Sequence, residues 1–158
     1  MPSIAPMMNR RELLGHGARL AGLLAGLGLL PEAAQAAWRE AAFAATDLAR
    51  VWTALGISAP QESADIRLIA PDLAENGAAV SLGCATRLEG VRRLLLLVER
   101  NPTVLCALFE VGPAVEPDVL IRTRMAESSP VWAVALMDDA RVLYARRTVE
   151  VTLGGCGG

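Results

Sequence analysis

The sequence contains no lysine and a single histidine. All 15 of its basic residues are arginine, against 17 acidic residues, and the formal net charge is −2. Such a chain has no basic face for nucleic acid or for an anionic lipid surface. The one histidine, His16, lies in a segment that we expect to be removed, so the mature chain would lack an imidazole for base catalysis or metal ligation. We therefore expect neither a catalytic residue nor a metal site in this chain.

A long apolar run is also missing. The longest N-terminal run, Leu20 to Leu30, is too short to cross a hydrocarbon core of ~30 Å at 1.5 Å per residue. An arginine pair, Arg10 and Arg11, precedes this run. An arginine pair followed by a short apolar run resembles a twin-arginine export signal. The layout predicts a periplasmic protein that has no membrane anchor.

A small-x-small motif, Ala34-Gln35-Ala36, follows this run and is typical of a signal cleavage site. We predict a signal peptide over residues 1–36 and cleavage between Ala36 and Ala37. The mature chain would then carry the whole fold.

The first part of the mature chain predicts one N-terminal helix over residues 37–56, ending at Gly56. Five residues with three- and four-residue spacing would form its buried face: Trp38, Ala42, Ala45, Ala49 and Trp52. We expect the two tryptophans to pack in the core, because their spacing places them on that apolar face.

Seven short β-rich runs follow, without a helical period between them. They cover residues 64–71, 78–86, 91–100, 103–112, 118–127, 131–137 and 141–153. Turn residues separate several of the runs: Asn76-Gly77, Asn101-Pro102, Gly112-Pro113, Ser129-Pro130 and Asp138-Asp139. This pattern predicts an all-β fold, an immunoglobulin-like antiparallel β-sandwich, over residues 57–153.

Two of the runs, "LLLLV" and "VLCALF", are apolar on both faces. A small two-layer sandwich covers only one face of each sheet, so the apolar surplus suggests a partner subunit.

The three cysteines lie in two kinds of sequence. Cys84 and Cys106 stand in the middle of apolar runs and are expected to behave as small buried hydrophobes, with a disulfide between them left open. Cys156 stands near the C-terminus among four glycines: Gly154, Gly155, Gly157 and Gly158. Because glycine packs nothing and a chain end is rarely held, we predict that residues 154–158 form a flexible arm that displays the thiol of Cys156.

The terminal "VTLGGCGG", the internal "APDLAENGAAV" and "VERNP", the "TRMAES" run and the twin-arginine leader closely resemble the SoxY family. These are the sulfur carriers of bacterial periplasmic thiosulfate oxidation. The resemblance implies that Cys156 carries covalent sulfur adducts, a thiosulfonate and a persulfide, and that no cofactor is bound. It implies SoxZ as heterodimer partner and transient docking with the cytochrome SoxAX, the dimanganese hydrolase SoxB and the sulfane dehydrogenase SoxCD. On this interpretation the chain is not an enzyme but the carrier on which enzymes act.

Two other functions stay open at this point. The terminal Gly157-Gly158 would suit a thiocarboxylate sulfur carrier, although such carriers need a cytoplasmic β-grasp fold. Alternatively, the chain would be an exported binding module whose terminal cysteine forms an intermolecular disulfide.

Overall fold

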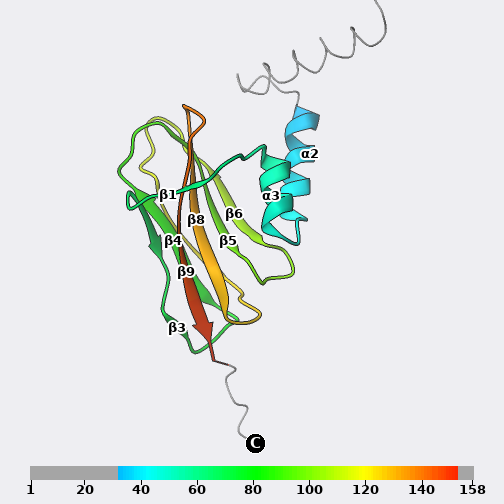
Figure 1. Cartoon of the computed structure of the whole chain (residues 1–158), viewed down its shortest axis with the longest axis vertical. Coiled ribbons are helices and arrows are strands. Elements are labelled where there is room, and N and C mark those ends of the chain that lie inside the picture. The colour runs from blue at the N-terminus through cyan, green and yellow to red at the C-terminus, as the bar shows by residue number, and fades with distance from the viewer. Residues whose placement is uncertain (1–31, 153–158) are drawn as a thin grey trace, which may run out of the picture. The chain divides into compact units, whose positions relative to one another are not determined.

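The computed structural model describes residues 32–152, with side chains from Ala36 onward. The fold lies in the second of two compact units, which begins at Trp38. Within this unit, two β-sheets pack face to face, as the sequence predicted (Figure 1). The all-β sandwich is therefore confirmed.

Each sheet has its own strand order. The six-stranded sheet runs β1-β9-β8-β5-β6, with β3 on the same edge of β9 as β1, and the three-stranded sheet runs β2-β4-β7. The strands are β1 (Gln61–Glu62), β2 (Ile66–Ile69), β3 (Leu73–Ala74), β4 (Val80–Thr86), β5 (Val91–Val98), β6 (Leu105–Glu110), β7 (Asp118–Thr123), β8 (Ser129–Met137) and β9 (Val142–Val151). All seven predicted strands are present.

Two short strands depart from the antiparallel pattern, because β1 and β3 both pair with β9 in parallel. Each of these strands has two residues, too few to show a period-2 pattern in the sequence. The predicted turn at Ser129-Pro130 is wrong, since these residues begin β8. Proline is accommodated there because a strand's first residues can dispense with a ladder N–H.

The predicted single helix is two helices, α2 (Glu32–Phe43) and α3 (Leu48–Leu55). Asp47 interrupts the helix because its side chain accepts a hydrogen bond of 2.8 Å from the Arg50 N–H and so caps a new N-terminus. The interruption changes the buried face, so that Ala49 is exposed and Val51 is fully buried instead. The predicted end at Gly56 is confirmed, where φ is +64° in the left-handed region that glycine favours.

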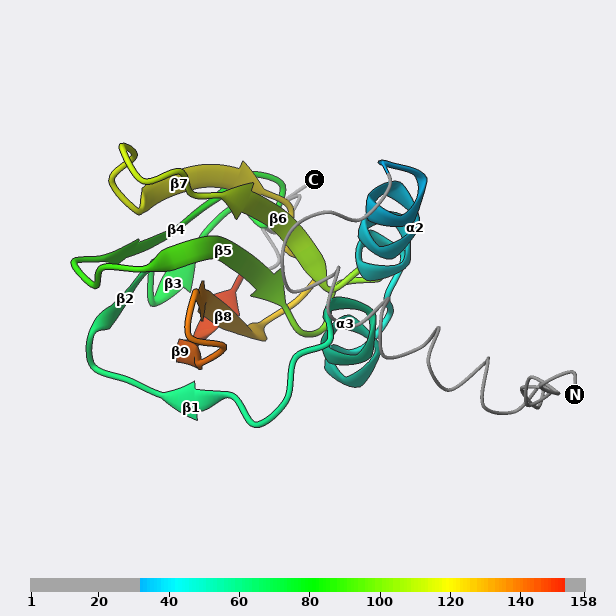
Figure 2. The same cartoon turned by 90° about the horizontal axis from the view of Figure 1, so that it is seen from above.

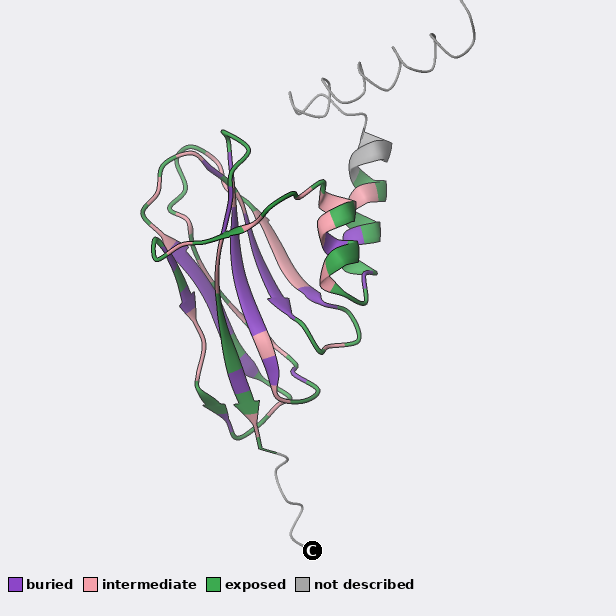
Figure 3. Ribbon diagram, viewed as in Figure 1, coloured by how far each residue is buried: buried purple, intermediate pink, exposed green. Residues whose placement is uncertain are grey.

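The apolar surplus of β5 is covered within the chain. Leu94, Leu96 and Val98 face the core between the two sheets. Leu95 and Leu97 face outward and pack in a second core with residues of α2 and α3. Figure 2 shows the two helices beside the six-stranded sheet, and Figure 3 shows that its central strands are mostly buried. The argument from these strand faces to a partner subunit is therefore wrong, because the chain's own helical segment buries the outer side chains of β5.

Candidate functional site

The last strand, β9, ends at the candidate site, and backbone hydrogen bonds to neighbouring segments continue to its last residues. Its end pairs in parallel with β3, where Leu73 lies opposite Glu150 and Ala74 opposite Val151. Beyond the strand, the Thr152 N–H donates to the carbonyl oxygen of Ala74 at 3.0 Å. The backbone is thus ordered by hydrogen bonds up to Thr152.

The other side of this strand end is held by the connection between β7 and β8. The Val151 N–H donates to the Ser128 hydroxyl at 2.8 Å. Gly77 packs closely against the same end, because a Cβ at this position would lie 2.6 Å from the Met125 carbonyl oxygen and 2.9 Å from Val151 Cγ1. We call Gly77, Ser128, Val151 and Thr152 the arm root.

Cys156 and its four flanking glycines lie outside the described residues, as do Arg10 and Arg11. Chain length nevertheless limits where the thiol can be. Cys156 is four residues beyond Thr152, and at ~3.3–3.6 Å per residue its Cα stays within roughly 14 Å of the arm root. The predicted cleavage residues Ala36 and Ala37 are described and lie exposed in α2.

Charged residues surround the arm root on its β3 side. Arg147 on β9 forms an ion pair of 3.2 Å with Asp72 and donates to the carbonyl oxygen of Ala70, also at 3.2 Å. The pair joins β9 to the segment before β3. Both charged side chains are well exposed, so the pair contributes little to the stability of the fold. Glu150 next to the root is exposed as well.

Cys84 is a buried thiol in the middle of β4. None of its surface is exposed, and it belongs to the core between the two sheets. Burial, with a smaller effect from the Asp118 carboxylate, raises the pKa of the Cys84 thiol from 9.0 to about 12. This thiol is therefore neutral and inaccessible at neutral pH, as the sequence predicted.

Cys106 lies at an irregularity of β6. Leu96 pairs with Ala107 and the next residue, Leu97, with Leu105, which leaves Cys106 as the extra residue of a β-bulge. The side chain is half-buried, and burial raises the pKa of its thiol, while hydrogen bonds with Thr123, Val98 and Asn101 partly offset that effect. Cys84 and Cys106 are both free thiols, so the disulfide left open by the sequence is not formed.

Sequence reasoning missed the residues that form the arm root. Asn76-Gly77 indicated a turn, but nothing in the pattern showed that this turn packs against Val151. Ser128 stands in a run without periodicity, and its hydrogen bond joins residues 23 positions apart. Long-range contacts of this kind leave no local signal.

Neither a metal site nor a membrane span is found in residues 32–152. No group of three histidine, cysteine or acidic side chains in this part of the chain could hold a metal ion. No helix in the same range is long and apolar enough to cross a membrane.

Comparison with known families assigns the chain. The model of the family described as sulfur oxidation protein SoxY matches residues 52–156, from α3 to the cysteine of the predicted arm. The chain belongs to the SoxY family. The identification from the terminal motif is thus confirmed, and Cys156 falls within the matched region. Among curated proteins, none matches the chain.

Solved structures agree with this assignment. The sulfur carrier protein SoxY from Chlorobium limicola f. thiosulfatophilum is 32% identical, with a TM-score of 0.59, and the match covers 65% of this chain and 93% of that chain. A superoxide reductase (neelaredoxin) from Ignicoccus hospitalis is 15% identical, with a TM-score of 0.50, and the match covers 55% and 80%. The second similarity shows a shared fold alone. The SoxY matches support a carrier role in sulfur oxidation for this chain.

Proposed function

We propose that the mature chain is a periplasmic sulfur carrier that holds thiosulfate-derived sulfur on Cys156 and presents it to successive Sox enzymes. The observation that carries this proposal is the contrast between the thiols. Cys84 and Cys106 are held within the sandwich and the pKa values of their thiols are raised, whereas Cys156 lies four residues beyond Thr152, the last residue of the described fold. On this proposal, Cys156 is the thiol that enters the active sites of the Sox enzymes.

The chemistry of loading joins two sulfur atoms. The thiolate of Cys156 and the outer sulfur of thiosulfate form an S–S bond, and two electrons pass to the cytochrome SoxAX. An unassisted thiol has a pKa of about 8.5, so only a few per cent is thiolate at neutral pH. The carrier therefore depends on the enzyme to activate its thiol, which fits a protein that is not itself an enzyme.

Release of sulfate is a hydrolysis. SoxB adds water to the sulfonate end of the adduct, sulfate leaves, and a persulfide remains on Cys156. SoxCD, where it is present, oxidises the persulfide sulfur further. The glycines on both sides of Cys156 suit this sequence of visits, because an arm without side chains is narrow and its backbone turns freely.

Two further parts of the proposal concern export and assembly. The arginine pair and the motif before Ala37 support export by the twin-arginine pathway, which carries folded proteins. Membership of the SoxY family supports SoxZ as the heterodimer partner. A partner without a signal of its own would leave the cytoplasm together with the folded chain.

Mass spectrometry of protein from cells grown on thiosulfate tests the proposal. We expect sulfur or thiosulfonate mass on Cys156 and loss of thiosulfate oxidation in Cys156→Ser. Cys84→Ser and Cys106→Ser are the matched controls and should keep the activity. Sulfur on Gly158 would instead indicate the thiocarboxylate carrier, and a disulfide alone would indicate the binding module. Full activity of Cys156→Ser would refute the carrier function.

A further inference from the structure

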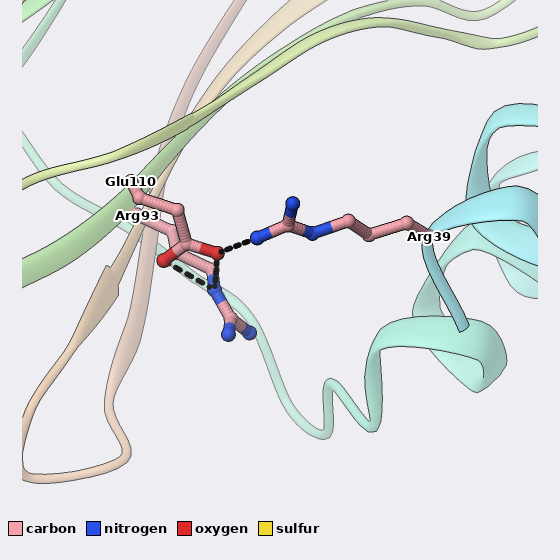
Figure 4. Close-up of polar contacts among 3 residues, drawn as sticks. All are labelled: Arg39, Arg93 and Glu110. Atoms are coloured by element: carbon pink, nitrogen blue, oxygen red, sulfur yellow. Dashed lines mark hydrogen bonds and ion pairs between the residues drawn. The ribbon is translucent and has the colours of Figure 1, made fainter. Parts of the chain in front are cut away.

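The first residues of the folded unit are attached to the six-stranded sheet by a group of four side chains. Glu110 on β6 forms ion pairs with Arg39 on α2 at 3.1 Å and with Arg93 on β5 at 3.0 Å (Figure 4). Arg93 binds both carboxylate oxygens of Glu110, and its guanidinium lies 4.6 Å from the ring centroid of Trp38. We call Trp38, Arg39, Arg93 and Glu110 the α2 clasp.

A second attachment lies one turn further along. Ala42 is fully buried in the outer core, and Ala45 is 4% exposed. The carbonyl oxygen of Ala45 accepts a hydrogen bond of 3.0 Å from the Val104 N–H. The chain is therefore fixed from Trp38 to Ala45, whereas the preceding residues Ala36 and Ala37 are exposed.

The sequence contains the small-x-small motif twice in this region. Ala34-Gln35-Ala36 precedes the clasp, and Ala42-Phe43-Ala44 lies within the attached part of the chain. By residue type, both motifs suit a leader peptidase. A peptidase acts on a locally unfolded substrate, so a helical motif must open before it is cut. The first motif becomes accessible when its helical turn unfolds. The second motif must also detach from the six-stranded sheet before a peptidase can bind it.

We propose that the α2 clasp, together with buried Ala42, confines signal cleavage to the Ala36–Ala37 bond by keeping the second motif closed. This inference rests on the proposed export function. The excluded reaction is hydrolysis of the Ala44–Ala45 bond, in which water leaves a carboxyl group on Ala44 and an amino group on Ala45. That cut would remove Trp38, Arg39 and Ala42, and would uncover the part of the outer face of the six-stranded sheet that α2 covers.

Two substitutions test the clasp without changing either cleavage motif. Glu110→Gln and Arg93→Gln lie on β6 and β5, so any change in cleavage must act through the fold. The purified full-length precursor is incubated with a leader peptidase of small-x-small specificity, and the new N-termini are read by mass spectrometry. The wild type should yield Ala37 alone. Each variant should add a product that begins at Ala45, which the wild type does not yield, because loss of the ion pair lets the second motif detach from the sheet more often.

Matched variants separate this effect from others. Asp139→Asn removes the carboxylate of another exposed ion pair, in which Asp139 lies 2.7 Å from Arg141, and this variant should yield Ala37 alone. Ala44→Leu, at an exposed position, should abolish the new product in the Glu110→Gln background. Hydrogen exchange of the precursors should become faster in residues 39–44 of the clasp variants and stay unchanged in β8.

The outcomes distinguish the inference from the export proposal. A wild type that is cut before both Ala37 and Ala45, or clasp variants that are cut before Ala37 alone, would overturn the inference and leave the leader in place. A wild type that is not cut before Ala37, with protected amides in residues 39–44, would overturn the leader itself and the clasp's role in processing with it.

Discussion

At the scale of single residues, the structure gives the two described thiols different environments. Cys84 is enclosed by β2, β4 and β7, with no exposed surface. Cys106 occupies a β-bulge and is half-buried beside Asn101. The side-chain amide of Asn101 donates a hydrogen bond of 2.7 Å to the Arg124 carbonyl oxygen. Desolvation is the main cause of the raised pKa at both positions. Burial in the sandwich thus disfavours the thiolate at both positions, which supports the proposal that Cys156 carries the sulfur.

The raised pKa of Cys84 predicts a loss of stability at alkaline pH. The folded state holds the thiol proton more tightly than the unfolded chain, because the pKa is about 12 in the fold against 9.0 ordinarily. The stabilisation is complete below pH 9 and is lost as the pH rises toward 12. We expect the wild type to lose free energy of unfolding more steeply than Cys84→Ala between these pH values. Denaturant titrations across the range measure the difference, and identical slopes would contradict the assigned burial.

At the scale of elements, β9 connects the fold to the arm. Its outer edge accepts β1 near one end and β3 at the other, while β8 pairs with it along most of its length. The strand is therefore held on both edges where it approaches Val151. The structure thus holds the chain in place up to Thr152, the last described residue before the glycine-rich segment that the sequence predicts to be a flexible arm.

The close packing of Gly77 makes the arm root sensitive to a single methyl group. Gly77→Ala would place its Cβ 2.6 Å from the Met125 carbonyl oxygen, so the backbone of one segment must move. We expect destabilisation by about 1–3 kcal/mol, as for other overpacked sites, and faster hydrogen exchange at Val151. Gly112→Ala is the matched control, because the nearest atom to its Cβ would be Val115 Cγ2 at 3.9 Å. Equal stabilities of the two variants would show that the root is not tightly packed.

The sequence predicted those elements that carry a local pattern. Seven strands follow from β-rich runs between turn residues, and the end of the helical segment follows from Gly56. The break at Asp47 was missed because the apolar spacing from Trp38 to Trp52 continues across it. The pairing of β3 with β9 and the contact of Ser128 with Val151 depend on distant segments, so no local pattern predicts them. Cys156 stays a prediction from the local sequence, a cysteine among four glycines, because it lies outside the described residues.

At the scale of the whole folded unit, the two sheets differ in their outer faces. Part of the outer face of the six-stranded sheet, including Leu95 and Leu97 of β5, is covered by α2 and α3, and Trp52 packs edge-on against Trp132 with ring centroids 6.4 Å apart. The three-stranded sheet instead presents an apolar row across its strands, formed by Ile69, Gly83 and Leu120 in register. Leu120 is 63% exposed. Its side chain and that of Ile69 both lie close to Gly83, since a Cβ at Gly83 would be 3.0 Å from Leu120 Cδ1 and 3.2 Å from Ile69 Cβ.

This difference predicts which face takes part in the proposed heterodimer with SoxZ. An apolar row that carries a well-exposed leucine, Leu120, suits an interface centre, whereas a face partly covered by helices offers less apolar surface. We expect co-expression with SoxZ to give a 1:1 complex in size-exclusion chromatography and Leu120→Asp to weaken it at least tenfold, with little change in melting temperature because the side chain is exposed. Phe43→Asp, on α2 and 40% exposed, is the matched control and should bind SoxZ like the wild type.

Tryptophan fluorescence adds a second measurement. Trp38, Trp52 and Trp132 all lie on α2, α3 or the strand face beneath these helices, so their emission should stay unchanged when SoxZ binds. Loss of the complex in Phe43→Asp, with a shifted emission in the wild-type complex, would place SoxZ on the helices and refute the prediction.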